Sequence, residues 1–360
     1  MTKRLTKADY TNACKTLASA FEDCPDTIKP VTIIQNGKVG TPGVSDIDLI
    51  FVFPADFTAG DEFKTYYENV INNIPHKEIF FIHSPIVIDE HNVKDLPLYT
   101  MNPARNMKII FGKKPDFSAQ DTSRMQSALI SMEFIQFRLI QLMSMLVNNH
   151  YDLNSILLRG HTLAHSISLA KRAKIQVDDK MFKGLGYVED FRDQMAKGQA
   201  VQISDADTKK LFMRVVKEFY ILYLQFCNLM EEHIHFYAPE DGHYEYTQNV
   251  FLAGVLTRSE EFKAHTAEGK TVYQGLHWTN MALRDLYFGL DQKNSKILVT
   301  EELRAECEKR RDFMKNVWAW NVKAFGNMNA GLSHKPCVDG TVTETLAAQH
   351  LDLKTYADAA

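Results

Sequence analysis

Cysteine is scarce in this chain, and its few copies form no pattern. Their number is odd and no two are spaced as a Cys-x-x-Cys pair; the five are Cys14, Cys24, Cys227, Cys307 and Cys337. An odd count without paired spacing argues against a complete disulfide framework. We therefore expect reduced thiols and a cytoplasmic protein.

Long hydrophobic runs are also missing. The opening residues, MTKRLTKADY, have no apolar core, so we expect no secretory signal. The most apolar long segment, residues 128–147, is interrupted by Glu133, Gln136, Arg138 and Gln141. That pattern predicts a buried or amphipathic helix, and we expect no membrane partner.

Positive charge is not in excess. The formal net charge is −4, with 45% hydrophobic and 24% charged residues, which is ordinary for a globular protein. Without a basic field the chain carries no strong sign of nucleic-acid binding, although a local basic groove stays open. The sequence also has no P-loop, no Gly-x-Gly-x-x-Gly motif and no nucleophile elbow.

The first third of the chain has the pattern of a small α/β domain. At 360 residues the chain suits two domains, with room for a third small unit. Within residues 1–115 helical patterns alternate with apolar, β-rich runs; the helices are expected at 6–24 and 60–73, and the runs lie at 31–35, 46–53, 78–83, 85–88 and 107–111. This order predicts an α/β (α+β) domain with a mixed sheet.

From residue 116 the pattern becomes helical. Apolar positions recur three and four apart over 119–148, 153–174 and 205–235, which predicts an all-α helical bundle across 116–336. The sequence is mixed beyond about residue 240, where a small C-terminal subunit is possible, and a helix is predicted at 300–324. Residues 337–360 are small and polar and predict a tail.

The segment that carries chemistry runs from 36 to 49, NGKVGTPGVSDIDL. Residues i and i+2 of a strand share a face, so Asp46 and Asp48 project together while Ile47 turns into the core. Two adjacent carboxylates repel unless a cation lies between them, and Mg²⁺ takes oxygen ligands together with substrate phosphates. The preceding glycines let backbone N–H groups approach phosphate oxygens. The plainer interpretation is a surface turn before a strand whose first residues are merely polar.

This segment resembles the nucleotidyltransferase fold superfamily, of the DNA polymerase beta-like or minimal nucleotidyltransferase type. The matching positions are Gly37, Gly43, Ser45, Asp46 and Asp48, and the MKIIFG run at 107–112 is similar to the strand that closes the domain in minimal members. The resemblance implies transfer of a nucleoside monophosphate from an NTP to an acceptor. It also implies that Asp46 and Asp48 hold Mg²⁺ or Mn²⁺, with Gly37, Lys38, Gly43 and Ser45 around the nucleotide.

Two positions depart from the family pattern. Lys38 stands where the family has serine; it can reach phosphate as a point charge, or it can crowd the backbone cradle. The family's third carboxylate has no obvious counterpart. Asp89, at the end of the PIVID run, is the best candidate for this catalytic position and Glu90 the second, and both can equally be loop residues before a helix near 92.

Histidines and tryptophans offer weaker signals. Arg159 and His165 resemble the Arg…His pair of helical ribonuclease domains that often accompany small nucleotidyltransferases, but their spacing puts them on roughly opposed helix faces, whereas His161 and His165 share one. Packing between helices is the plainer interpretation. A zinc site at His233, His235 and His243 would need a fourth ligand. Core packing is expected for Trp278, Trp318 and Trp320.

The sequence therefore predicts a metal-dependent nucleotidyltransferase whose helical half selects the acceptor. The acceptor is a small molecule, such as an antibiotic or a sugar phosphate, or a protein side chain, and the oligomeric state is open. The alternative is a catalytically inactive nucleotide-binding or regulatory module with the same fold. A third possibility, suggested by the helical half alone, is a toxin–antitoxin-like pair fused in one chain.

Overall fold

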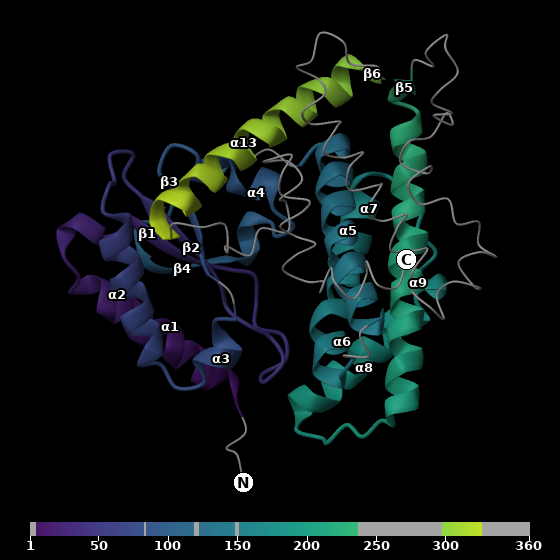
Figure 1. Ribbon diagram of the computed structural model, residues 1–360, viewed down its shortest axis with the longest axis horizontal. Helices are drawn as coiled ribbons and strands as arrows, with labels where there is room; N and C mark the ends of the chain where they lie inside the picture. The colour runs from purple at the N-terminus through teal and green to yellow at the C-terminus, as the bar shows by residue number, and fades with distance from the viewer. Residues whose placement is uncertain (1–4, 83, 119–121, 148–150, 237–296, 326–360) are drawn as a thin grey trace, which may run out of the picture. The chain divides into compact units, whose positions relative to one another are not determined.

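The structure is a computed structural model that describes residues 5–82, 84–118, 122–147, 151–236 and 297–325 (Figure 1). The chain divides into two compact units. Unit 1 comprises Met1–Thr122, Phe191–Val201 and Phe313–Leu332, and unit 2 comprises Ser123–Asp190, Gln202–Asp312 and Ser333–Ala360. Unit 1 thus takes in two later segments of the chain, which the single predicted border at residue 115 does not anticipate.

Unit 1 is built on a mixed four-stranded sheet, as the sequence predicts. Strand β1 (Thr32–Asn36) lies between β2 (Asp48–Phe53) and β4 (Met107–Gly112) and is antiparallel to both. Strand β3 (Ile86–Asp89) pairs with β2 in parallel, so the order is β3-β2-β1-β4. Strands β2 and β1 are therefore interior, and the residues at the two ends of β2 lie at opposite ends of the sheet along the strand direction.

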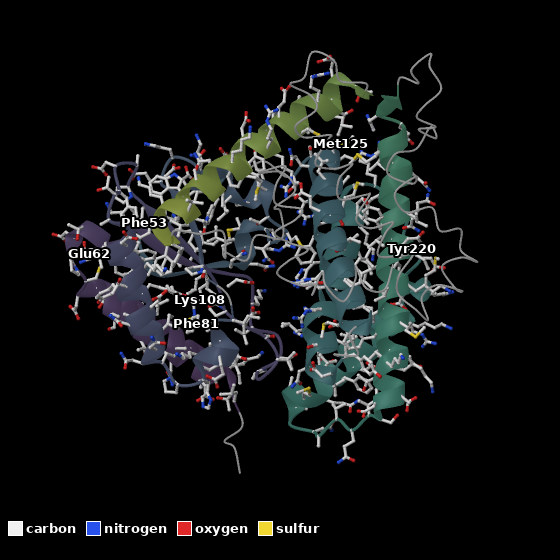
Figure 2. All side chains as sticks on the ribbon, in the orientation of Figure 1. Phe53, Glu62, Phe81, Lys108, Met125 and Tyr220 are labelled. Atoms are coloured by element: carbon white, nitrogen blue, oxygen red, sulfur yellow. The ribbon has the colours of Figure 1, made fainter. Side chains whose placement is uncertain are left out.

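Two helices cover one face of this sheet (Figure 1). They are α1 (Lys7–Glu22) and α2 (Gly60–Asn72), each with an apolar stripe at helical spacing. Phe21 of α1 and Phe63 of α2 are fully buried against Phe51 and Phe53 of β2, and Phe53 is labelled in Figure 2. Ile47, Leu49, Phe51 and Phe53 belong to this core, so the other β2 residues face the opposite side of the sheet.

The predicted β-rich run at 78–83 is wrong. Lys77–Phe80 form one turn of helix, α3, which follows His76 in the left-handed backbone region. The Phe80 ring packs into the core 4.4 Å from the ring of Tyr10, and its carbonyl accepts a hydrogen bond from the Ile47 N–H. Tertiary packing of one aromatic residue therefore overrides the β propensity of the local sequence.

A side-chain amide covers the β3 edge of the sheet, and a glycine permits the close pairing at the end of β4. Asn321, on α13 (Glu301–Phe325), accepts a hydrogen bond from the Val87 N–H and donates one to the Val87 carbonyl, both at 3.1 Å, so its amide pairs with the edge of β3. Where β4 ends against the start of β1, Gly112 has φ +76°, and a Cβ there would lie 2.0 Å from the Val31 carbonyl oxygen. Only glycine fits this end of β4.

Unit 2 is mostly helical. Helix α5 (Arg124–Val147) packs against α9 (Asp205–Glu231) and α7 (Thr162–Arg172), and α6 (Leu153–Gly160) precedes α7. The predicted helix at 153–174 is therefore two helices, joined at His161. A two-stranded antiparallel ladder of β5 (Ile234–Phe236) and β6 (Ile297–Val299) lies in the same unit, so the prediction of an all-α second part is wrong there.

Helix α8 (Lys183–Lys197) was not predicted, and it belongs to both units: Phe191 onward lies in unit 1. The remaining described elements are the short α4 (Leu96–Tyr99) and single 3₁₀ turns at Asp26–Ile28, Val93–Asp95, Ala104–Asn106 and Asp179–Met181. None of the described helices is long and apolar enough to cross a membrane. The predicted C-terminal subunit beyond 240, in most of its length, and the tail at 337–360 lie outside the described residues.

Candidate functional site

The glycine-rich segment between β1 and β2 is a loop, as its composition predicts. Gly37 and Gly43 have φ values of +89° and +87°, a region that side-chain-bearing residues rarely adopt. The Gly37 N–H donates to the Asn106 carbonyl at 3.0 Å, which joins the start of the loop to the segment before β4. The two glycines of the predicted motif are therefore required by the backbone of this loop.

Tyr10 of α1 fixes the far end of the loop. Its hydroxyl donates to the Ser45 carbonyl at 2.5 Å and accepts from the Gly43 N–H at 2.9 Å. Burial raises the pKa of Tyr10 above its ordinary value and the Asp46 carboxylate adds to this, while the Gly43 N–H and the Arg192 guanidinium act in the opposite direction. Tyr10 therefore lies within electrostatic reach of both Asp46 and Arg192.

Ser45 has a structural part in the loop. It is buried, and its hydroxyl accepts hydrogen bonds from the Thr41 N–H at 2.9 Å and from the Arg192 guanidinium at 3.2 Å. The Ser45 N–H in turn donates to the Thr41 carbonyl at 2.8 Å. These bonds close a tight turn immediately before the acidic pair.

Asp46 and Asp48 stand at the junction of this loop and β2. The strand begins at Asp48, two residues later than predicted, because β1 ends at Asn36, the partner of Asp48. Ile47 is 3% exposed and belongs to the core under α1 and α2, whereas both acids are half-buried. Strand alternation puts Asp48 on the sheet face opposite those helices, and Asp46 precedes it by two residues at the end of the loop.

Asp89 is not part of this site, so its prediction as the third carboxylate is wrong. It pairs with Phe53 at the far end of β2, five residues beyond Asp48 or roughly 16 Å at strand spacing. Its side chain shares the face of Phe53, opposite to that of Asp48. The carboxylate is 3% exposed and accepts hydrogen bonds from the His91 and Asn92 N–H groups and the Asn92 amide. Glu90 follows at the same end and is exposed.

Neutral polar residues flank Asp48 in the neighbouring strands. Asn36 is the direct partner of Asp48 in β1. On the other side, Ile50 pairs with Ile86, so extending this register by two residues places Ser84 beside Asp48 on the same face. The amide oxygen of Asn36 is buried with no hydrogen-bond partner. Across the part of the chain that the structure describes, no group of three or more His, Cys, Asp or Glu residues is arranged to hold a metal ion.

One cationic side chain of the loop and one from α8 lie at this site. Lys38 is exposed on the loop, at the position where the resembling family has serine. Arg192 reaches it from α8, and its guanidinium lies 3.1 Å from where a Cβ on Gly40 would stand. Lys108, labelled in Figure 2, is opposite Gln35 in β4 and therefore on the α1 face of the sheet, away from Asp48. Sequence reasoning missed Tyr10 and Arg192, which are remote in sequence and carry no local motif.

The histidine features predicted from the sequence form other contacts. The rings of His161 and His165 lie 5.3 Å apart, which confirms that they share a face, and His161 Nδ1 is 2.5 Å from a Glu189 carboxylate oxygen. His233 contacts the Thr300 hydroxyl at 3.0 Å. His243 lies outside the described residues, so zinc binding at His233, His235 and His243 stays an alternative that the structure does not test. Trp320 stacks on Phe57 in the core of unit 1.

Comparison of the chain with protein-family models, with curated proteins and with solved structures gave no match. The geometry of the loop and the acidic pair therefore carries the functional argument.

Proposed function

We propose that unit 1 binds a nucleoside triphosphate together with Mg²⁺ or Mn²⁺, as a nucleotide-binding or regulatory module of nucleotidyltransferase type. The observation that carries the proposal is the pair Asp46 and Asp48, half-buried on either side of the buried Ile47, directly after a loop with two glycines at positive φ. A divalent cation between two neighbouring carboxylates would relieve their mutual repulsion. The cation in turn favours a polyphosphate among its ligands.

We rank nucleotide binding above nucleotidyl transfer because Asp89, the predicted third carboxylate, does not lie beside Asp48. Two-metal transfer needs a group that prepares the acceptor oxygen, and in the resembling family the third carboxylate does this. Asp89 lies at the opposite end and on the opposite face of the sheet. Beside Asp48 the neighbouring strands present Asn36 and, by register, Ser84, which are both uncharged. These residues can donate oxygen to a cation but cannot take up a proton as a base.

Nucleotidyl transfer from an NTP to a small-molecule or protein acceptor is the second candidate. The retained pair Asp46 and Asp48 favours it, since these are the residues that would hold the metal in catalysis. In that reaction the protein would contribute chiefly positioning and electrostatic stabilisation of the phosphorus centre. The acceptor oxygen would have to lose its proton to a group other than Asp89.

The test is ligand-induced thermal stabilisation of the full chain. Each NTP should raise the melting temperature with Mg²⁺ or Mn²⁺ and not with a chelator, because the nucleotide binds through the metal. The double variant Asp46→Asn with Asp48→Asn should fold and lose this rise. A charge-matched control, Asp56→Asn with Asp61→Asn, removes two exposed acids of the same unit and should keep it. A rise that survives in the Asp46/Asp48 variant would place the binding site elsewhere. Pyrophosphate release measured in the same samples separates binding from transfer.

A further inference from the structure

Arg192 is a buried cation in contact with the loop, and no sequence motif identifies it. It lies on α8 in the Phe191–Val201 segment, which belongs to unit 1 although the chain on both sides of that segment belongs to unit 2. The residue is only 5% exposed. An arginine buried to this extent is held by polar or anionic partners in the fold, of which the Ser45 hydroxyl is one.

The surroundings of its guanidinium are those of the predicted phosphate cradle. One nitrogen donates to the Ser45 hydroxyl at 3.2 Å. Gly40 is packed so closely that a Cβ there would lie 3.1 Å from a guanidinium nitrogen, yet Gly40 itself is exposed. The guanidinium of Arg192 therefore lies against the loop. It is next to Gly40, which has no side chain and so leaves room for it.

The charge arrangement also suits a metal-bound polyphosphate. Arg192 and Asp46 act on the same Tyr10 hydroxyl with opposite sign, so cation and carboxylate both lie near the end of the loop. A divalent cation on Asp46 and Asp48 leaves a triphosphate with net negative charge. A planar guanidinium presents five donors in a fork that matches phosphate oxygens, often in bidentate fashion.

We infer that Arg192 is a direct phosphate ligand of the bound nucleotide, in addition to positioning the loop through Ser45. The inference rests on the proposed function and names a contact that the resemblance does not supply. Arg192 thereby completes the site of unit 1, although the sequence on both sides of its segment belongs to unit 2. Gly40 leaves room for the guanidinium at the loop, since a Cβ there would lie 3.1 Å from one of its nitrogens.

The experiment measures binding of Mg²⁺–ATP and of Mg²⁺–tripolyphosphate to the full chain by calorimetry. Arg192→Gln should weaken both about tenfold or more, as expected for loss of a charge-assisted phosphate contact. Arg192→Lys should weaken binding less than Arg192→Gln, because lysine keeps the positive charge but lacks the planar set of guanidinium donors. Arg214→Gln, which removes an exposed arginine of α9, is the matched control and should leave both affinities unchanged.

A double-mutant cycle separates contact from loop positioning. If Arg192 acts only through Ser45, Ser45→Ala should abolish the effect of Arg192→Gln; if it contacts phosphate, the loss persists in the Ser45→Ala background. Gly40→Ala provides a second route, since it displaces the guanidinium without removing it and should also weaken binding, whereas Gly186→Ala meets open space and should not.

The outcomes distinguish the two proposals. Wild-type affinity in Arg192→Gln, or a loss that vanishes when Ser45 is absent, overturns the inference and leaves the proposed function standing. Absence of metal-dependent nucleotide binding in the wild-type chain, with either Mg²⁺ or Mn²⁺, overturns the proposed function and the inference with it.

Discussion

At the residue scale, the candidate site combines positions that a sequence motif reveals with positions that it cannot. Gly37, Gly43, Asp46 and Asp48 are predictable because a tight turn needs glycine and because the two acids stand two residues apart at the start of an apolar strand. Tyr10 lies 35 positions before its partner Ser45, and Arg192 lies 147 positions after it. No periodicity joins such distant residues, so only the folded chain reveals that they hold the loop.

The hydroxyl of Tyr10 gives a first prediction. Tyr10→Phe keeps the ring on Phe80 but leaves the Gly43 N–H and the Ser45 carbonyl without this partner. We expect a loss of about 1–3 kcal/mol in the free energy of unfolding, together with weaker metal–NTP stabilisation. Tyr66→Phe is the control, because it also removes one hydroxyl-to-carbonyl bond, to Ala20, away from the loop. Equal effects of the two variants on nucleotide binding would contradict a role for Tyr10 in the site.

Ser84 gives a second prediction, of gained activity. Ser84→Asp would install a carboxylate level with Asp48 in the adjacent strand, where register places Ser84. We expect tighter Mn²⁺ binding and the appearance, or an increase, of pyrophosphate release from NTP, since a third acid can take up the acceptor's proton. Ser84→Asn controls for size without charge, and Asp89→Asn should not change nucleotide binding. Unchanged metal affinity and pyrophosphate release in Ser84→Asp would show that this position does not face the metal.

At the element scale, the long helices and the central strands follow from the sequence, and the short elements do not. In residues 205–231 and 301–325, apolar residues recur at helical spacing over several turns, which is enough to predict a helix. The run at 78–83 is too short for its pattern to outweigh the packing of Phe80. The error at Asp89 is one of strand direction: the apolar run predicts the strand, but which of its ends lies beside Asp48 depends on β2 and β3 being parallel.

The cover of β3 by α13 gives a third prediction. Asn321→Ala removes both hydrogen bonds to the Val87 backbone, and these groups are buried. We expect the free energy of unfolding, from urea titration, to fall by about 1–3 kcal/mol or more. The neighbouring Val322→Ala changes an exposed side chain and should have little effect. A loss no greater than that of the Val322 variant would mean that water replaces the amide at this sheet edge.

At the scale of the whole molecule, unit 1 depends on chain that comes long after its sheet. Helices α8 and α13 each supply one part to unit 1 and the rest to unit 2. The residues of α13 in unit 1 include Asn321 at the sheet edge and Ala324 and Phe325 in the core. Periodicity identifies α13 as a helix but not as part of the N-terminal core, which explains why the sequence predicts one border where the fold has several.

The last prediction is that a chain truncated after Thr122 will not fold on its own. It lacks Phe325, whose ring lies 5.5 Å from that of Phe63, and also Asn321 and Arg192. Loss of one buried phenylalanine costs about 3–5 kcal/mol, against a total stability of about 5–15 kcal/mol for a typical protein. Circular dichroism of the fragment should show no cooperative thermal unfolding, whereas the full chain carrying Asn321→Ala and Phe325→Ala should unfold cooperatively at a reduced midpoint because the rest of α13 remains. Cooperative unfolding of the fragment at the full chain's midpoint would show that the sheet and α1–α3 are a self-sufficient domain, and that the later segments only rest on it.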